Sequence, residues 1–293
     1  MKRVMLILLA LLLLLPGCGT PAEYAQVAAT TLPVYEFTAR LCEGTGITVT
    51  RLVTESVSCL HNYSLNVEQV RAAEAAQTIV ISGAGLEEFM EDVLDQAGTV
   101  IDASSGIEIH EGEEEEEEVT HNHEGHHHEA DSHIWLSPEN ASVMARNICA
   151  GLCAQYPACQ ETFARNLDGL IADLNALENY GREALTTLAC RELITFHDGF
   201  GYFAESFDLH ILKAIEEESG AEASAAELKE LILLVRAHDL PAVFTETNGS
   251  ASAASVISRE TGAAVYTLDM AMAGDSYFDA MYHNIDTIKE ALG

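Results

Sequence analysis

Basic residues are scarce in this chain of 293 residues. Lys and Arg number 14 against 47 Asp and Glu, which gives a formal net charge of −33. Nucleic-acid phosphates are bound through Lys and Arg, and anionic lipid surfaces attract basic segments. The composition therefore excludes nucleic acid as a partner and charge-driven adsorption to lipid. A strongly negative field instead raises the local concentration of cations, including metal ions.

The chain also lacks an apolar run long enough to cross a membrane. Its longest run, Val4 to Leu15, has about a dozen residues, whereas a spanning helix needs roughly 20. A short run behind the basic head Met1-Lys2-Arg3 is typical of a signal peptide. Leu15-Pro16-Gly17-Cys18 resembles the lipobox of bacterial lipoproteins, so we expect cleavage before Cys18 and lipidation of that residue. The alternative is ordinary secretion with Cys18 unmodified, and both predict an exported protein.

No Cys-x-x-Cys pair occurs, which disfavours a zinc site built from cysteines. Without Cys18 an even number of cysteines remains, and export allows them to form disulfides. Sequence alone does not choose among the 15 possible pairings, and buried free thiols remain an alternative for several of them. The residues are Cys42, Cys59, Cys149, Cys153, Cys159 and Cys190.

One tract, at residues 108–131, combines acids with histidines. It contains six consecutive glutamates, Glu113 to Glu118, and no Lys or Arg occurs between Arg71 and Arg146. A tract this polar cannot bury enough apolar surface to fold by itself, so we expect a loop. Imidazole and carboxylate are good ligands for zinc, which predicts a secondary, low-affinity metal loop; the alternative is a solvated acidic linker. Its candidate ligands are His121, His123, His126, His127 and His128.

Strand-like and helix-like segments alternate on both sides of this loop. Such alternation predicts an α/β fold with mostly parallel sheets covered by helices. The expected strands are Val27–Leu32, Ile47–Val53, Thr78–Ser82, Thr99–Asp102, Leu193–Phe196, His210–Lys213, Ala242–Glu246 and Ala264–Leu268. The expected helices are Pro33–Leu41, Asn66–Ala76, Leu86–Gln96, Ser137–Leu152, Cys159–Leu188, Phe200–Phe207, Ala225–His238, Ser250–Thr261 and Tyr277–Leu292.

The segment Cys159–Leu188 stands out because it has no proline and repeats apolar residues every three or four positions. Its length, roughly 45 Å at about 1.5 Å per residue, exceeds what one lobe needs. Gly169 and Gly181 weaken it modestly. We expect an N-terminal lobe over residues 19–152, a long linking helix within 153–189, and a C-terminal lobe over 190–293.

Four residues outside the His-rich tract are candidate metal ligands: His61, His133, His197 and Asp269. Each comes from a different supersecondary unit, two from each lobe, and His61, His197 and Asp269 follow strands. Parallel sheets bind ligands beyond the carboxyl ends of their strands, so we expect a metal site in the cleft between the lobes. Three imidazoles and a carboxylate suit tetrahedral zinc. Taken singly, each histidine has a structural alternative as a hydrogen-bonded loop residue, and Asp269 as a cap.

Three motifs carry a resemblance to a known family. They are His133-Ile-Trp135-Leu-Ser-Pro138, Phe196-His-Asp-Gly-Phe200-Gly-Tyr202-Phe203, and the tail Tyr277 to Leu292 with Asn284-Ile-Asp. The chain resembles the ZnuA/TroA-like metal-binding lipoproteins of bacterial zinc and manganese ABC importers over nearly its whole mature length. The resemblance implies two α/β lobes joined by one rigid helix, and ligands at His61, His133, His197 and Asp269, with Glu246 in reserve. Cys59-Leu60-His61 departs from the family's usual Asp-Pro-His.

The resemblance also implies a function without catalysis. The protein would capture Zn²⁺ outside the cell as a monomer anchored through Cys18 to the outer face of the cytoplasmic membrane, and deliver it to an ABC permease with its ATPase. Asp198, Tyr202 and Trp135 stand beside candidate ligands and would orient or shield them. Manganese is the alternative cargo, but nitrogen at His197 favours zinc. Two other functions stay open: a surface metal buffer or adhesin, and an extracellular zinc hydrolase, which would need an open coordination position.

Overall fold

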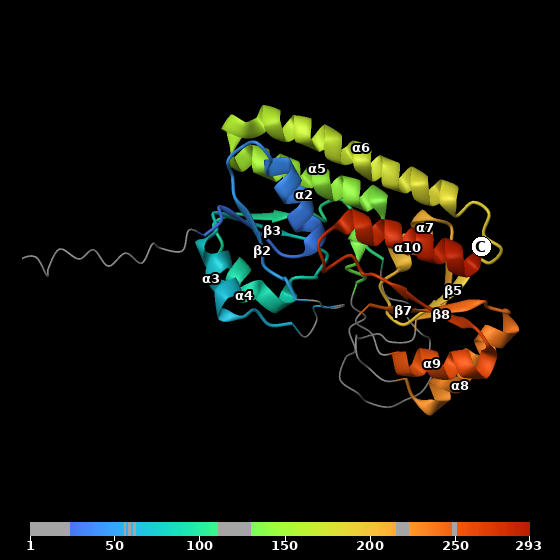
Figure 1. The fold of residues 1–293 in the computed structure, drawn as a ribbon. Helices are drawn as coiled ribbons and strands as arrows, with labels where there is room; N and C mark the ends of the chain where they lie inside the picture. Colours follow the sequence, from blue (N-terminus) through green and yellow to red (C-terminus); the bar gives the residue numbers. More distant parts are fainter. Residues whose placement is uncertain are drawn as a thin grey trace, which may run out of the picture.

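Two parallel sheets of four strands each form the core of the protein. The computed structural model describes residues 24–55, 57, 60, 63–110, 130–214, 223–247 and 251–293. The first sheet has the strand order β2-β1-β3-β4 and the second the order β6-β5-β7-β8, and all paired strands are parallel. The predicted α/β class with two lobes is therefore confirmed (Figure 1).

The N-terminal lobe is built from short strands connected by helices. Ala28 and Val80, which lie on the two central strands, have no exposed surface, as expected for a sheet covered on both faces. The strands are β1 (Val27–Ala29), β2 (Val49–Arg51), β3 (Thr78–Ile81) and β4 (Val100–Asp102). The helices are α2 (Leu32–Cys42), α3 (Val67–Ala75), α4 (Glu91–Leu94) and α5 (Pro138–Gln155), with 3₁₀ turns η1 (Glu88–Met90) and η2 (Ile134–Leu136).

The C-terminal lobe repeats this architecture with longer strands. Val243 and Phe244 of β7 are buried, and they pair in register with Val265 and Tyr266 of β8. The strands are β5 (Glu192–Thr195), β6 (His210–Ala214), β7 (Ala242–Glu246) and β8 (Ala264–Leu268). The helices are α7 (Gly201–Ser206), α8 (Ala225–Ala237), α9 (Ala251–Thr261) and α10 (Tyr277–Leu292).

Helix α6 (Gln160–Ala184) runs along both lobes (Figure 1). It packs on α2 and α5 of the first lobe and on α10 of the second. The predicted long helix is thus present, but it is shorter than expected at both ends. The 3₁₀ turn η3 (Pro157–Cys159) precedes it, and the hydroxyl of Thr186 bonds the carbonyl of Arg182 just beyond its last turn. Side-chain hydroxyls that bond the preceding turn compete with further helix formation.

One predicted helix, Leu86–Gln96, is broken in the structure. Only η1 and the single turn α4 form there. Glu87 turns inward, and its carboxylate accepts hydrogen bonds from Ser82 N (2.7 Å), Gly83 N (3.0 Å) and the Thr30 hydroxyl (2.6 Å). This carboxylate holds together the carboxyl ends of β1 and β3, a tertiary role that the apolar pattern of the segment does not show.

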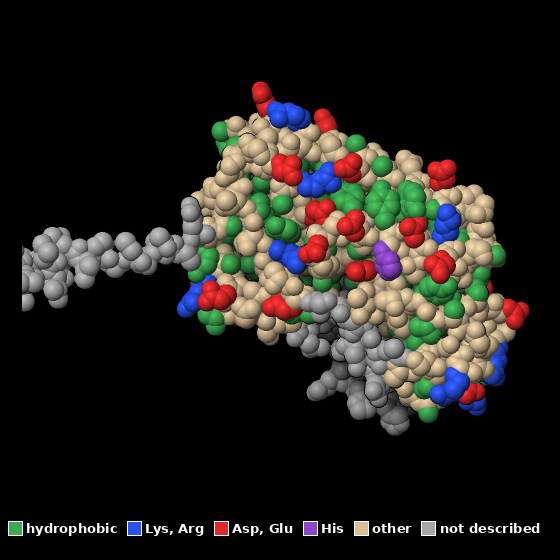
Figure 2. All heavy atoms as spheres, viewed as in Figure 1, with side chains coloured by type: hydrophobic (Ala, Val, Ile, Leu, Met, Phe, Trp, Pro, Cys, Tyr) green, Lys and Arg blue, Asp and Glu red, His purple; other side chains and the backbone are tan. Residues whose placement is uncertain are grey.

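Two of the expected helices begin with a side-chain cap. Asn66 caps α3 in a capping box with Gln69, and Ser137 accepts a hydrogen bond from Asn140 N at the start of α5. Within the described residues, no helix is both long and apolar enough to span a membrane. Asp and Glu are scattered over the face in Figure 2 and are more frequent there than Lys and Arg.

The cysteines that the structure describes are free thiols. For these residues, the structure therefore favours free thiols over disulfides. Burial raises the pKa of Cys42 to about 12, and the nearby Cys159 adds to the shift. Burial likewise raises the pKa of Cys149 to about 11, with Cys153 contributing. Such thiols react slowly, because the thiolate is the reactive form. Cys59 lies outside the described residues.

The two glycines of α6 should respond in opposite ways to alanine. Gly181 packs against the ring of Phe207, which a Cβ would overlap, whereas a Cβ at Gly169 meets nothing within 4 Å. We expect Gly181→Ala to lower the free energy of unfolding by about 1–3 kcal/mol through overpacking. Gly169→Ala should raise it by up to about 1 kcal/mol through helix propensity. Urea denaturation measures both, and equal stabilisation of the two variants would contradict the packing of α6 on Phe207.

Candidate metal centre

His133 enters the site with its ring orientation already set. It precedes η2 and has 4% of its surface exposed. The carboxylate of Asp131 lies 2.8 Å from the ring Nδ1 of His133 and accepts its backbone N–H at 2.9 Å. Because an ionised carboxylate only accepts hydrogen bonds, Nδ1 carries the proton. The lone pair of Nε2 is then available to a metal, as in the carboxylate–histidine pairs of zinc sites.

Asp131 stays ionised despite its partly buried position. Burial by itself would raise its pKa, but the hydrogen bonds from the ring and backbone of His133, with the charges of His133 and His110, outweigh burial and lower the pKa. A carboxylate held in its charged form strengthens the basicity of the imidazole that it contacts.

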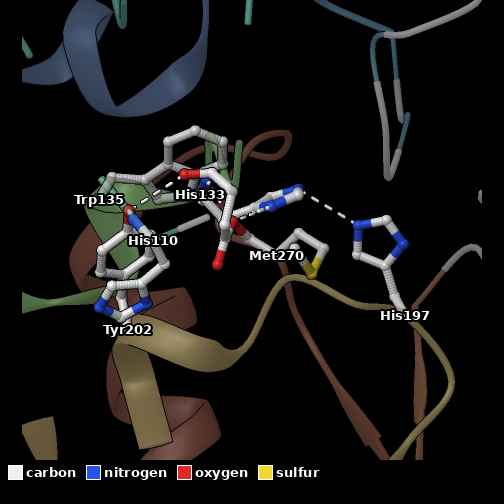
Figure 3. A network of polar contacts seen from close by, with 7 residues as sticks. His110, His133, Trp135, His197, Tyr202 and Met270 are labelled. Atoms are coloured by element: carbon white, nitrogen blue, oxygen red, sulfur yellow. Dashed lines mark hydrogen bonds and ion pairs between the residues drawn. The ribbon is translucent and has the colours of Figure 1, made fainter. Parts of the chain in front are cut away.

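His197 meets His133 from the other half of the chain. It lies two residues after β5, has 2% of its surface exposed, and its Nε2 is 3.2 Å from Nε2 of His133 (Figure 3). The two rings are nearly perpendicular, at 86°. Two nitrogens bound at about 2.0–2.1 Å to tetrahedral zinc lie about 3.3 Å apart. The pair is therefore spaced as two ligands of one zinc ion would be.

Gly199 gives the two rings room to approach. A Cβ at this position would lie 2.8 Å from Cδ2 of His197, 2.9 Å from Nδ1 of His133 and 2.8 Å from the methyl carbon of Met270. These distances are below those that real Cβ atoms adopt. The φ of Gly199 is not in the left-handed region, so the backbone conformation does not require glycine here. Glycine is required because the three side chains lie too close for a Cβ.

The backbone of Asp269 is fixed at the end of β8. Its N–H donates to Oδ1 of Asn284 and its carbonyl accepts from Nδ2 of the same side chain, both at 2.7 Å, and Asn284 is fully buried on α10. The indole of Trp135 donates to the carbonyl of the next residue, Met270, at 2.8 Å. The segment that follows β8 is thereby attached to the segment that carries His133.

The predicted site residues are placed unevenly. The structure brings together His133 and His197. Asp269 and Glu246 lie at the ends of β8 and β7, and the described ranges contain no group of three or more His, Cys, Asp or Glu arranged to hold a metal. His61 lies outside the described residues, as do His121, His123, His126, His127, His128 and Cys18. The four-ligand set therefore remains a prediction.

Sequence reasoning missed three contributors to this geometry. Asp131 was detectable, because an acid two residues before a candidate ligand is a common partner of imidazole. Asn284 belongs to a motif already noted, but its two hydrogen bonds to the backbone of Asp269 depend on how α10 packs. Gly199 also lies in a motif already noted, but its importance depends on a tertiary contact that the motif does not show. Of the residues expected to orient or shield ligands, Trp135 lies beside His133, with the ring centroids 5.4 Å apart.

The protein has two α/β lobes, a long helix that runs along both, and a buried histidine pair to which both halves of the chain contribute. These features define a two-lobed solute-binding protein. The family model described as "Zinc-uptake complex component A periplasmic" matches residues 27–291. The chain belongs to this family.

Individual relatives agree with this assignment. The zinc-binding lipoprotein AdcA of Streptococcus pneumoniae serotype 4 is 30% identical over 307 residues, covering 99% of this chain and 61% of its own length. The high-affinity zinc uptake system protein ZnuA of Bacillus subtilis strain 168 is 28% identical, covering 98% of this chain and 96% of its own. A crystal structure of ZnuA superposes with a TM-score of 0.79 at 29% identity, covering 92% of this chain and 100% of that one. The chain thus spans about three fifths of AdcA.

Proposed function

We propose that the protein binds one Zn²⁺ tightly between its lobes, with His61, His133, His197 and Asp269 as ligands. The observation that carries the proposal is the buried Nε2–Nε2 pair of His133 and His197, 3.2 Å apart, with Asp131 setting the tautomer of His133. Glu246, buried at the end of β7, is the reserve for the fourth ligand. Four protein ligands would close the coordination sphere, so the role is capture without catalysis.

Zinc is favoured over manganese by the chemistry of the donors. Two imidazole nitrogens already face each other, and nitrogen ligands suit zinc, whereas manganese prefers oxygen. Both relatives described above carry zinc in their names. Because protons compete with the metal for imidazole, zinc affinity should fall as the pH drops through the histidine range.

Delivery to an ABC importer completes the proposal. The family description names a component of a zinc-uptake complex that is periplasmic, which supports export and a transport partner. We infer that the chain is a monomeric lipoprotein anchored through Cys18 to the outer face of the bacterial cytoplasmic membrane. It would hand zinc to a permease whose ATPase drives import. The histidines at 121, 123 and 126–128 would collect metal weakly and pass it to the tight site.

Growth under zinc limitation tests the transport role. A strain that lacks this protein should grow poorly in chelated medium, and the wild-type chain should restore growth because uptake needs the tight site. His133→Ala should not restore it, while His210→Ala, an exposed histidine on β6, should. Metal content per cell would be measured alongside growth. Normal growth of the deletion strain would contradict a transport role and favour a surface buffer.

A further inference from the structure

His110 and Asp131, which are far apart in the sequence around the acidic tract, meet on helix α7. The backbone N–H of Asp131 donates to the carbonyl of His110 at 3.0 Å. Both residues then contact Tyr202 of α7, which is 2% exposed. Its hydroxyl accepts the backbone N–H of His110 at 2.9 Å and donates to the carbonyl of Asp131 at 3.1 Å. The buried hydroxyl of Tyr202 thus bonds the backbones of both His110 and Asp131.

His110 and Asp131 also contact α7 through their side chains. The imidazole of His110 stacks on the ring of Tyr202, with centroids 4.0 Å apart and planes 14° apart (Figure 3). Nε2 of His110 lies 3.1 Å from a carboxylate oxygen of Glu205, also on α7. At Gly201 the backbone approaches Asp131 so closely that a Cβ would lie 3.2 Å from its Oδ2. Asp131 is therefore held in place through both its backbone and its side chain.

The contacts form a chain that ends at the metal-facing nitrogen of His133. Tyr202 fixes the backbone of Asp131, and the Asp131 carboxylate fixes Nδ1 of His133. Nε2 of His133 then faces His197, which stands four residues before α7. The short segment from His197 to Tyr202 accordingly provides one ring of the pair and orients the other.

We propose that Tyr202 is a positioning residue for zinc capture, acting through Asp131 on the ring of His133. This inference rests on the proposed function, since it assigns a role in the same site. The hydroxyl keeps Asp131 where its carboxylate holds the proton of Nδ1, so that Nε2 is presented to the metal before the metal arrives. Removal of outer partners of a metal ligand typically reduces affinity about 10- to 100-fold.

Tyr202→Phe removes the hydroxyl and keeps the ring that stacks on His110. The dissociation constant for Zn²⁺, measured by chelator competition on the mature chain, should rise about tenfold or more. Tyr180→Phe is the matched control, because its hydroxyl bonds Asp286 on α10, remote from this network. In the metal-free proteins, ¹⁵N NMR of the histidine rings should show a fixed Nδ1–H tautomer for His133 in the wild type and a mixture in Tyr202→Phe. A general loss of stability would not produce that change.

A double-mutant cycle with Asp131→Asn tests whether Tyr202 acts on His133 through Asp131. If Tyr202 acts through Asp131, the two changes should cost less together than the sum of their separate effects. Fully additive effects, or an unchanged affinity and tautomer in Tyr202→Phe beside tight wild-type binding, would overturn the proposal alone. A wild-type chain without tight zinc binding would overturn the proposed function as well.

Discussion

His197→Ala is expected to lower the zinc affinity by more than about a hundredfold, since even partners outside the ligand shell contribute about 10- to 100-fold. The substitution removes one nitrogen of the 3.2 Å pair and leaves Nε2 of His133 facing an empty space. Because His197 is buried, water would have to enter the site to replace the missing ligand. Competitive titration with a chromophoric chelator measures the change.

Two comparisons separate the buried pair from the acidic tract. A variant without residues 121–128 should keep the tight site and lose only weak binding. The surface substitution His210→Ala should change neither. If His197→Ala retained wild-type affinity while the deletion abolished it, metal would be bound by the tract, and the protein would be a buffer instead of an uptake component.

Gly199→Ala should weaken zinc binding without removing any ligand. The new Cβ would fall 2.8 Å from the ring of His197 and 2.9 Å from Nδ1 of His133, so the rings must move. Since Asp131 holds Nδ1, movement would break that bond or change the Nε2–Nε2 spacing. We expect the dissociation constant to rise about tenfold or more, as for other changes that disturb ligand orientation. The free energy of unfolding should fall by about 1–3 kcal/mol.

The methyl group of Met270 offers a way to check the cause. It is the flexible end of a side chain and lies 2.8 Å from the position that the new Cβ would take. Met270→Ala in the Gly199→Ala background should relieve that contact without recovering the zinc affinity, because both rings would still be displaced. Full recovery of affinity would contradict the role given to Gly199. Gly169→Ala serves as the control for a glycine with open space around it.

Local patterns predicted most elements of the fold. β7, β8 and α10 have the predicted bounds, because apolar strands and a capped amphipathic helix are encoded within short windows. The helix predicted over 86–96 was wrong because Glu87 turns inward, where its carboxylate accepts hydrogen bonds from the backbone N–H of Ser82, just after β3, and from the hydroxyl of Thr30, just after β1. The ends of α6 also depended on hydrogen bonds that a periodic pattern does not contain.

The two histidines that meet in the structure were identifiable from the sequence, but the distance between them was not. His133 and His197 stand in recognisable motifs, and the structure places them against each other. The bond from Asp131 could have been expected from its place two residues before His133. Tyr202 was expected to orient or shield a ligand, but the contact of its hydroxyl with Asp131 depends on how α7 packs beside His133. The need for a glycine at position 199 depends on the same packing.

The most direct measurement is a crystal structure of the zinc-loaded mature chain, with anomalous data collected above and below the zinc edge. We predict one strong anomalous peak within about 2.0–2.1 Å of Nε2 of both His133 and His197. A carboxylate oxygen of Asp269 and a nitrogen of His61 should complete the tetrahedron. A peak elsewhere, with these two rings still in direct contact, would contradict the central claim.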